Sequence, residues 1–94
     1  MAIVEDPEQY EVMALARMVP AFAGLAVLEI GAGDGRLTRR YSAGARSVVA
    51  IDPKPESIAS LRADLPDVDA RTMGIEDLQL SAHSVDVVIF SWAL

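Results

Sequence analysis

Apolar residues along the chain form two kinds of pattern. Short continuous runs rich in β-branched side chains are typical of strands buried on both faces of a sheet. Between these runs, apolar residues recur every three or four positions, as on one face of a helix. Strands are therefore predicted at residues 25–30, 47–51, 68–72 and 85–91, and helices at 7–20, 36–43 and 56–63.

Residues that begin and end helices support these boundaries. Asp6, Pro7 and Gln9 suit an N-cap, a first helical position and the reciprocal position of a capping box. Gly44 is typical of a helix C-terminus, and Pro66 ends the third helix. Residues 76–84 are predicted to be loop, either throughout or with one helical turn. Alternating strands and helices predict an α/β fold with a doubly wound, mostly parallel, Rossmann-like sheet, forming one domain over residues 1–94.

A glycine-rich loop follows the first of these predicted strands. Gly31, Gly33 and Gly35 occupy alternate positions between that strand and a predicted helix. Strand, glycine-rich turn and helix in this order are typical of a nucleotide-type binding loop, where glycine permits unusual dihedrals and close approach of a ligand. A glycine motif alone is weak, and the alternative is a turn that binds nothing.

The details of the loop disfavour a dinucleotide. The dinucleotide fingerprint needs its third glycine at position 36, which is Arg36. Asp34 would lie beside the pyrophosphate and repel it. The hypothesis of an NAD-dependent oxidoreductase is therefore disfavoured.

Asp52 stands 21 residues after Gly31, at the end of the second strand. An acid at this spacing reaches the ribose of a bound nucleoside in such folds, because a carboxylate accepts hydrogen bonds from both ribose hydroxyls. The alternative is structural, since Asp before Pro53 also starts turns. Loop and acid together favour the ribose role.

Four segments now resemble the motifs of class I S-adenosylmethionine (SAM) dependent methyltransferases. They are residues 29–35 with the pattern Glu-x-Gly-x-Gly-x-Gly, 48–52, 73–78 and 84–91, in the order and spacing of that family. The resemblance implies SAM as cofactor and S-adenosylhomocysteine (SAH) as product. The cofactor-binding residues that it implies are Glu29, Gly31, Ala32, Gly33, Gly35, Ile51, Asp52, Pro53, Ile75, Glu76, Phe90 and Ser91.

The resemblance also assigns roles within this set. Glu29 would orient the loop and face the amino end of the methionine moiety, which would lie against the glycine backbone. Ile51 and Pro53 would contact the adenine, and the Ile75 amide would bind its edge. Phe90 and Ser91 would line the floor of the site.

Position 74 departs from the family pattern. Many members have Asp or Asn there, with a side chain that contacts the adenine amino group, whereas this chain has Gly74. The contact would have to come from Glu76, Asp77 or the backbone.

The family sheet has the strand order 3-2-1-4-5-7-6, of which this chain supplies 3-2-1-4. Strand 4 would then be an edge strand, and its apolar sequence over residues 85–94 invites pairing with another chain. We therefore expect either the N-terminal part of a longer methyltransferase, truncated after strand 4, or a homodimer or partner complex formed at strand 4.

Composition narrows the possible partners and location. The formal net charge of −6 disfavours nucleic acid, and the apolar runs are too short for a membrane span. The chain has no cysteine and no signal-peptide pattern at its start, which predicts a cytoplasmic protein without a thiolate metal site. The single histidine, His83, lies in a polar loop and is predicted to be solvated, and no metal is expected.

Two functions remain. The first is the SAM-binding half of a methyltransferase acting on an unidentified small-molecule acceptor, because residues 90–93 lack the Asn-Pro-Pro-Tyr type of motif found in many enzymes that methylate nitrogen in DNA bases or glutamine. The alternative is a non-catalytic, truncated domain that acts in self-association or regulation of a partner. Neither assigns catalytic residues, and whether the chain is an enzyme stays open.

Overall fold

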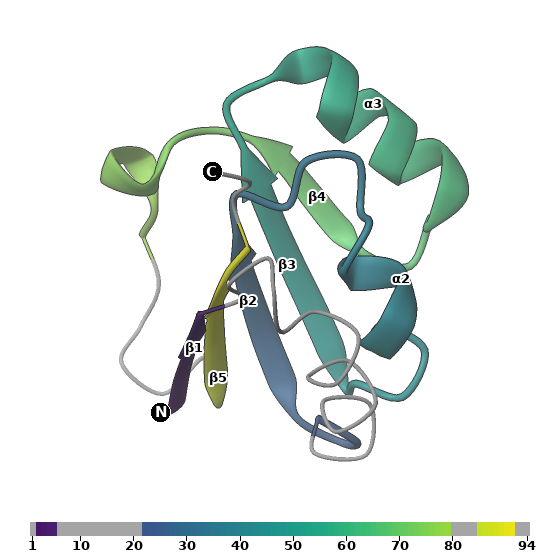
Figure 1. Cartoon of the computed structure of the whole chain (residues 1–94), viewed down its shortest axis with the longest axis vertical. Helices are drawn as coiled ribbons and strands as arrows, with labels where there is room; N and C mark the ends of the chain where they lie inside the picture. Colours follow the sequence, from purple (N-terminus) through teal and green to yellow (C-terminus); the bar gives the residue numbers. More distant parts are fainter. Residues whose placement is uncertain (1, 6–21, 80–84, 92–94) are drawn as a thin grey trace.

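The computed structural model of the chain describes residues 2–5, 22–79 and 85–91. Its described residues form a parallel sheet with α-helices packed on one face (Figure 1). The described strands are β1 (Ala2–Glu5), β2 (Ala26–Ile30), β3 (Ser47–Asp52), β4 (Asp69–Thr72) and β5 (Val87–Phe90). The described helices are α2 (Thr38–Tyr41), α3 (Pro55–Asp64) and the single 3₁₀ turn η2 (Ile75–Asp77).

The strand order is β1-β5-β2-β3-β4, and every pairing is parallel. β2 lies at the centre, and all of its residues are buried, which explains its continuous apolar sequence. Numbered as in the sequence analysis, the order β4-β3-β2-β5 is 3-2-1-4. The predicted fold class and strand order are therefore confirmed.

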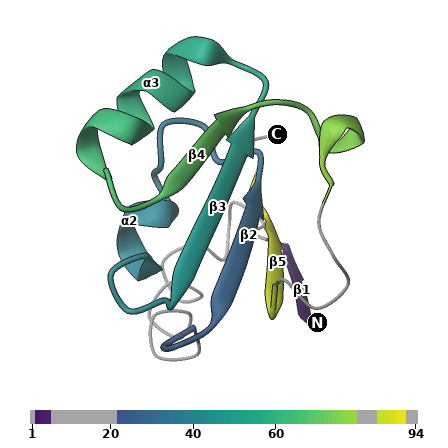
Figure 2. The same ribbon diagram turned by 180° about the vertical axis from the view of Figure 1, so that it is seen from behind.

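Two apolar clusters cover the two faces of the sheet. On one face, Leu37 and Tyr41 of the α2 region and Ile58 and Leu61 of α3 pack against residues of the strands, Val27 among them. On the other face, buried side chains of β2, β3 and β5 form a smaller cluster with partly buried residues from the segment that follows β4. Figure 2 shows the sheet from this second side, with α2 and α3 behind it.

β1 contradicts the expectation that strand 4 forms an edge. Ala2 to Glu5 pair in parallel with Val87 to Phe90, so β5 lies between β1 and β2. No strand was predicted here, because Ile3 and Val4 alone are too short a β-branched run to stand out. The pairing is made with a segment far along the chain, which local patterns cannot reveal. The helix predicted over residues 7–20 lies outside the described residues.

The helix predicted over residues 36–43 is shorter than expected. Only Thr38–Tyr41 is α-helical, and hydrogen-bonded turns flank it. Gly35 has a φ of +93°, a left-handed conformation that cannot belong to the helix, and Leu37 at the N-cap makes no side-chain capping bond. α3 begins with Pro55 at its first position and matches its prediction within one residue at each end.

Candidate functional site

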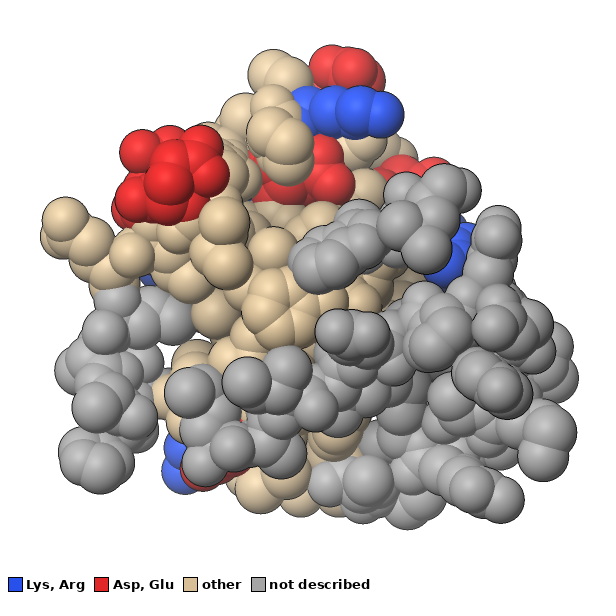
Figure 3. All heavy atoms as spheres, turned by 60° about the vertical axis from the view of Figure 1, so that its left-hand side comes forward, with Lys and Arg blue, Asp and Glu red and all other residues tan. Residues whose placement is uncertain are grey.

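A cavity of about 590 Å³ opens where β2, β3 and β5 end. The carboxyl ends of parallel strands are where open α/β sheets bind ligands. The cavity is lined by Ile30, Gly31, Gly33, Ile51, Asp52, Pro53, Lys54, Ser57, Met73, Gly74, Ile75 and Phe90. Figure 3 shows acidic side chains, with a basic group among them, toward the upper end of one face, the end at which these strands finish. The charged residues of the cavity lining are Asp52 and Lys54.

The glycine loop turns sharply between β2 and α2. Gly31, Gly33 and Gly35 have φ values of +77°, +59° and +93°, which residues with a side chain rarely adopt. The Gly31 and Ala32 amides donate to the Ile51 carbonyl over 2.9 and 3.1 Å, which ties the loop to the end of β3. A Cβ built on Gly33 would meet no atom within 4 Å, so the loop leaves open space at this position beside the cavity.

Gly35 serves a different purpose from Gly33. It is buried and does not line the cavity, and a Cβ built on it would lie 3.2 Å from Cγ of Leu61 in α3. Its lack of a side chain allows the loop to pack closely on α3. The described geometry thus gives it a packing role, whereas its predicted cofactor contact has no counterpart in the cavity lining.

Asp52 bridges the glycine loop and the start of α3. Its Oδ2 accepts a hydrogen bond from the Gly33 amide and its Oδ1 accepts one from the Lys54 amide, each over 2.9 Å. The second bond is the Asp turn that the sequence offered as the structural alternative. Each oxygen also has a further lone pair, so the carboxylate retains acceptor capacity toward the cavity. The ribose contact stays a prediction.

Glu29 is completely buried behind the loop, with 0% exposure. The Thr38 and Tyr41 hydroxyls donate to its Oε1 over 2.7 and 2.6 Å, and the Ser91 hydroxyl donates to its Oε2 over 2.5 Å. Burial, followed by the negative charge of Glu29 and the hydrogen bond to it, raises the pKa of Tyr41 far above its usual range. Neither Glu29 nor Ser91 lines the cavity, so their described contacts are with the protein rather than with ligand space.

The segment after β4 forms one wall of the cavity. Ile75 in η2 is 53% exposed, the only large hydrophobic side chain so exposed among the described residues. The neighbouring Glu76 folds back over Gly74, and a Cβ built on Gly74 would overlap its carboxylate. This carboxylate therefore occupies the space that a side chain at position 74 would take.

The structure brings most of the predicted site residues together. Those that line the cavity are Gly31, Gly33, Ile51, Asp52, Pro53, Ile75 and Phe90, and those that do not are Glu29, Ala32, Gly35, Glu76 and Ser91. Sequence reasoning missed Ile30, Lys54, Ser57, Met73 and Gly74 as lining residues. Lys54 and Ser57 flank the start of α3, and their position directly after Asp52 and Pro53 is the signal that could have found them.

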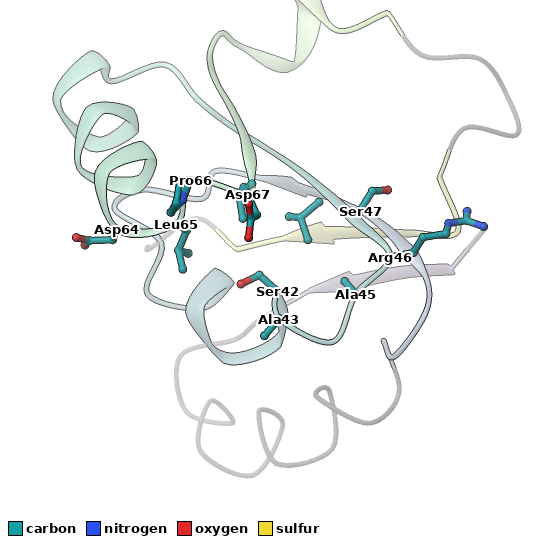
Figure 4. A pocket seen from close by; sticks show the side chains of 11 residues that line it. Ser42, Ala43, Ala45, Arg46, Ser47, Asp64, Leu65, Pro66 and Asp67 are labelled. Atoms are coloured by element: carbon teal, nitrogen blue, oxygen red, sulfur yellow. The ribbon is translucent and has the colours of Figure 1, made fainter.

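A second cavity, of about 380 Å³, lies at the amino ends of β3 and β4 (Figure 4). Two of its charged residues are already in ion pairs: Asp64 with Arg39 at 2.6 Å and Arg46 with Asp86 at 3.4 Å. It lies at the opposite end of β3 from the glycine loop. Across residues 2–5, 22–79 and 85–91, no three His, Cys, Asp or Glu side chains gather as metal ligands. None of the helices described there is long and apolar enough to cross a membrane.

Comparison with known proteins identifies the family. The model of the methyltransferase domain family matches residues 27–94. An uncharacterized methyltransferase of Mycobacterium tuberculosis is 40% identical over 84 residues, which cover 89% of this chain and 34% of that protein. This chain thus spans about a third of the length of that relative.

Solved structures agree with this assignment. A SAM-dependent methyltransferase from Mesorhizobium loti superposes with a TM-score of 0.73 at 29% identity, covering 88% of this chain and 39% of that one. Phosphoethanolamine N-methyltransferase 1 of Haemonchus contortus, in complex with phosphoethanolamine and SAH, has a TM-score of 0.73 at 25% identity, covering 92% of this chain and 20% of that one. The chain belongs to the class I, Rossmann-like family of SAM-dependent methyltransferases, whose cofactor is SAM.

Proposed function

We propose that this chain forms the SAM-binding part of a methyltransferase that acts on a small-molecule acceptor. The observation that carries the proposal is the cavity at the carboxyl ends of β2 and β3, where the glycine loop and Asp52 meet. The open space at Gly33 suits a ligand that lies directly on the backbone. A cytoplasmic location stays a prediction from the sequence.

Each part of the cavity suits one part of the cofactor. The methionine moiety would lie along Gly31 and Gly33, and the ribose hydroxyls would donate to Asp52. The adenine would lie against the apolar wall beside Ile51 and Ile75. The Glu76 carboxylate, folded over Gly74, would accept the hydrogen bond from the adenine amino group that family members with Asp or Asn at this position accept.

The bound cofactor supplies an electrophilic methyl group on a sulfonium. Transfer would be an in-line displacement in which an acceptor lone pair forms the new bond to the methyl carbon, the carbon–sulfur electron pair stays on the sulfur of SAH, and the proton released by the acceptor passes to solvent. Much of such catalysis is positioning. Phe90, at the end of β5, lines the cavity and would border the space for the acceptor. The acidic net charge of −6 favours a small acceptor over nucleic acid.

Calorimetric titration with SAH, and with NAD in parallel, tests this proposal. We expect micromolar SAH affinity and no NAD binding. Gly33→Val should abolish SAH binding, because its side chain would fill the open space beside the cavity and Val is strained at a φ of +59°. Full-strength SAH binding by a folded Gly33→Val variant would show that the ligand does not lie on this loop. NAD binding instead of SAH binding would contradict the proposed cofactor.

A further inference from the structure

Ser91 connects the end of β5 to the glycine loop through three consecutive residues. Its amide donates to the Ile30 carbonyl over 2.9 Å, which continues the pairing of β2 with β5. Its hydroxyl donates to Glu29 Oε2 over 2.5 Å and lies 3.3 Å from the Gly31 carbonyl oxygen. Ser91 thus contacts the last two residues of β2 and the first residue of the loop.

The contact with Gly31 acts on the first peptide of the loop. A hydroxyl has one hydrogen, so the shorter bond to Glu29 takes most of it and the Gly31 carbonyl shares it at longer range. Because a peptide unit is planar, holding the Gly31 oxygen also aims the Ala32 amide, which donates to the Ile51 carbonyl over 3.1 Å. The Ser91 hydroxyl therefore contacts the same Gly31–Ala32 peptide unit whose amide bonds the loop to β3.

Burial strengthens this connection. Ser91 is 7% exposed and Glu29 is 0% exposed, so water competes little for their hydrogen bond. Bonds to charged groups are also stronger than bonds between neutral groups. Since neither side chain lines the cavity, any effect of theirs on a ligand passes through the loop backbone.

We propose that Ser91 is a positioning residue that holds the glycine loop in its ligand-ready conformation. It does so by fixing the Glu29 carboxylate and the Gly31 carbonyl together. A loop that is already ordered loses less conformational freedom when a ligand binds. The ligand itself, SAM or SAH, rests on the proposed function, but the order of the loop does not.

Amide hydrogen exchange in the ligand-free protein, followed by SAH titration, tests Ser91→Ala. Exchange at the Gly31, Ala32 and Gly33 amides should accelerate about tenfold, and SAH affinity should fall about tenfold, as for loss of a hydrogen bond to a charged group. Ser91→Thr keeps the hydroxyl and should restore both properties.

Tyr41→Phe is the matched control. It removes a hydroxyl that donates to the same Glu29 carboxylate, but this hydroxyl comes from α2 and bonds to Oε1. The remaining ring keeps its edge-on packing against Phe22, with centroids 5.4 Å apart. We expect Tyr41→Phe to reduce stability and to leave loop exchange within about twofold of wild type, because its hydrogen bond, although also made to a charged group, reaches Oε1 and does not touch the loop.

Unchanged loop exchange in Ser91→Ala, or equal acceleration in Ser91→Ala and Tyr41→Phe, would overturn the role of Ser91. If the wild-type chain binds no SAH, the proposed function fails, and the exchange comparison alone decides on Ser91. Should Ser91→Ala not fold, Ser91→Cys replaces it in the same comparison, because a thiol fills the site but donates weakly.

Discussion

The Asp52 carboxylate is bonded to the protein backbone on both of its oxygens. The Gly33 and Lys54 amides each donate to one oxygen, which fixes the loop and the start of α3 relative to one another. The remaining lone pairs of the same oxygens are available to the hydroxyls of a ligand. The two sequence interpretations of Asp52, turn formation and ribose binding, are therefore compatible in this geometry, and only the second needs a ligand to test it.

Asp52→Ala should weaken SAH binding by roughly 10- to 150-fold, because loss of a hydrogen bond to a charged group costs about 1.5–3 kcal/mol. Calorimetry measures this change. Asp67→Ala is the matched control, because Asp67 is an exposed acid at the second cavity and should not affect SAH affinity. Wild-type affinity in a folded Asp52→Ala variant would exclude the ribose role.

At the scale of elements, the glycine loop and α3 are fitted to one another through Gly35. The residue has a φ of +93°, and Leu61 lies 3.2 Å from the position of an added Cβ. Leu61 itself is 0% exposed, so it has little room to move away. Backbone strain and crowding therefore act in the same direction at this position.

Gly35→Ala should lower the free energy of unfolding by about 1–3 kcal/mol, from the left-handed conformation together with overpacking. Chemical denaturation measures it. Gly44→Ala is the matched control: its nearest neighbour is the Tyr41 carbonyl oxygen at 3.9 Å and its φ is outside the left-handed range, so its stability should change by less than about 1 kcal/mol. Equal effects of the two substitutions would contradict a packing role for Gly35.

Elements whose sequence pattern lies within a few neighbouring residues could be predicted from the sequence. The apolar runs of β2, β3 and β5, the glycine loop and Asp52 all carry their pattern within a few residues, and the structure places the loop and Asp52 at one cavity. Contacts between distant residues could not be predicted. The sequence gives no sign that Glu29 receives the Ser91 hydroxyl, or that Gly35 faces Leu61. Those facts depend on how strands and helices pack, and the cofactor contacts assigned to Glu29, Gly35 and Ser91 stay predictions outside the cavity lining.

At the scale of the whole molecule, β1 changes which surface is available for association. It occupies the outer edge of β5, where the sequence predicted pairing with another chain. An occupied edge has its backbone groups satisfied and offers no template to a partner. We therefore propose that partner or self-pairing at β5 occurs only when β1 is displaced.

Deleting residues 2–5 should expose the edge of β5 and increase self-association. Light scattering should show a larger mean mass for the deletion variant than for the full chain at equal concentration. Amides of residues 87–90 that bond to β1 should also exchange faster in the deletion variant if it remains monomeric. Unchanged mass together with unchanged exchange would contradict the protective role of β1.

The pairing of β1 with β5 also sets an order of events during synthesis of the chain. Ala2 pairs with Val87 and Glu5 with Phe90, so each β5 residue is made 85 residues after its partner in β1. At the usual rate of roughly 5–20 residues per second, β1 emerges about 4–17 s before its partner. β2, β3 and β4 pair with nearer neighbours in sequence and can assemble in that interval. The segment made early is thus the one that joins the sheet late, and until then its backbone groups lack their β5 partners.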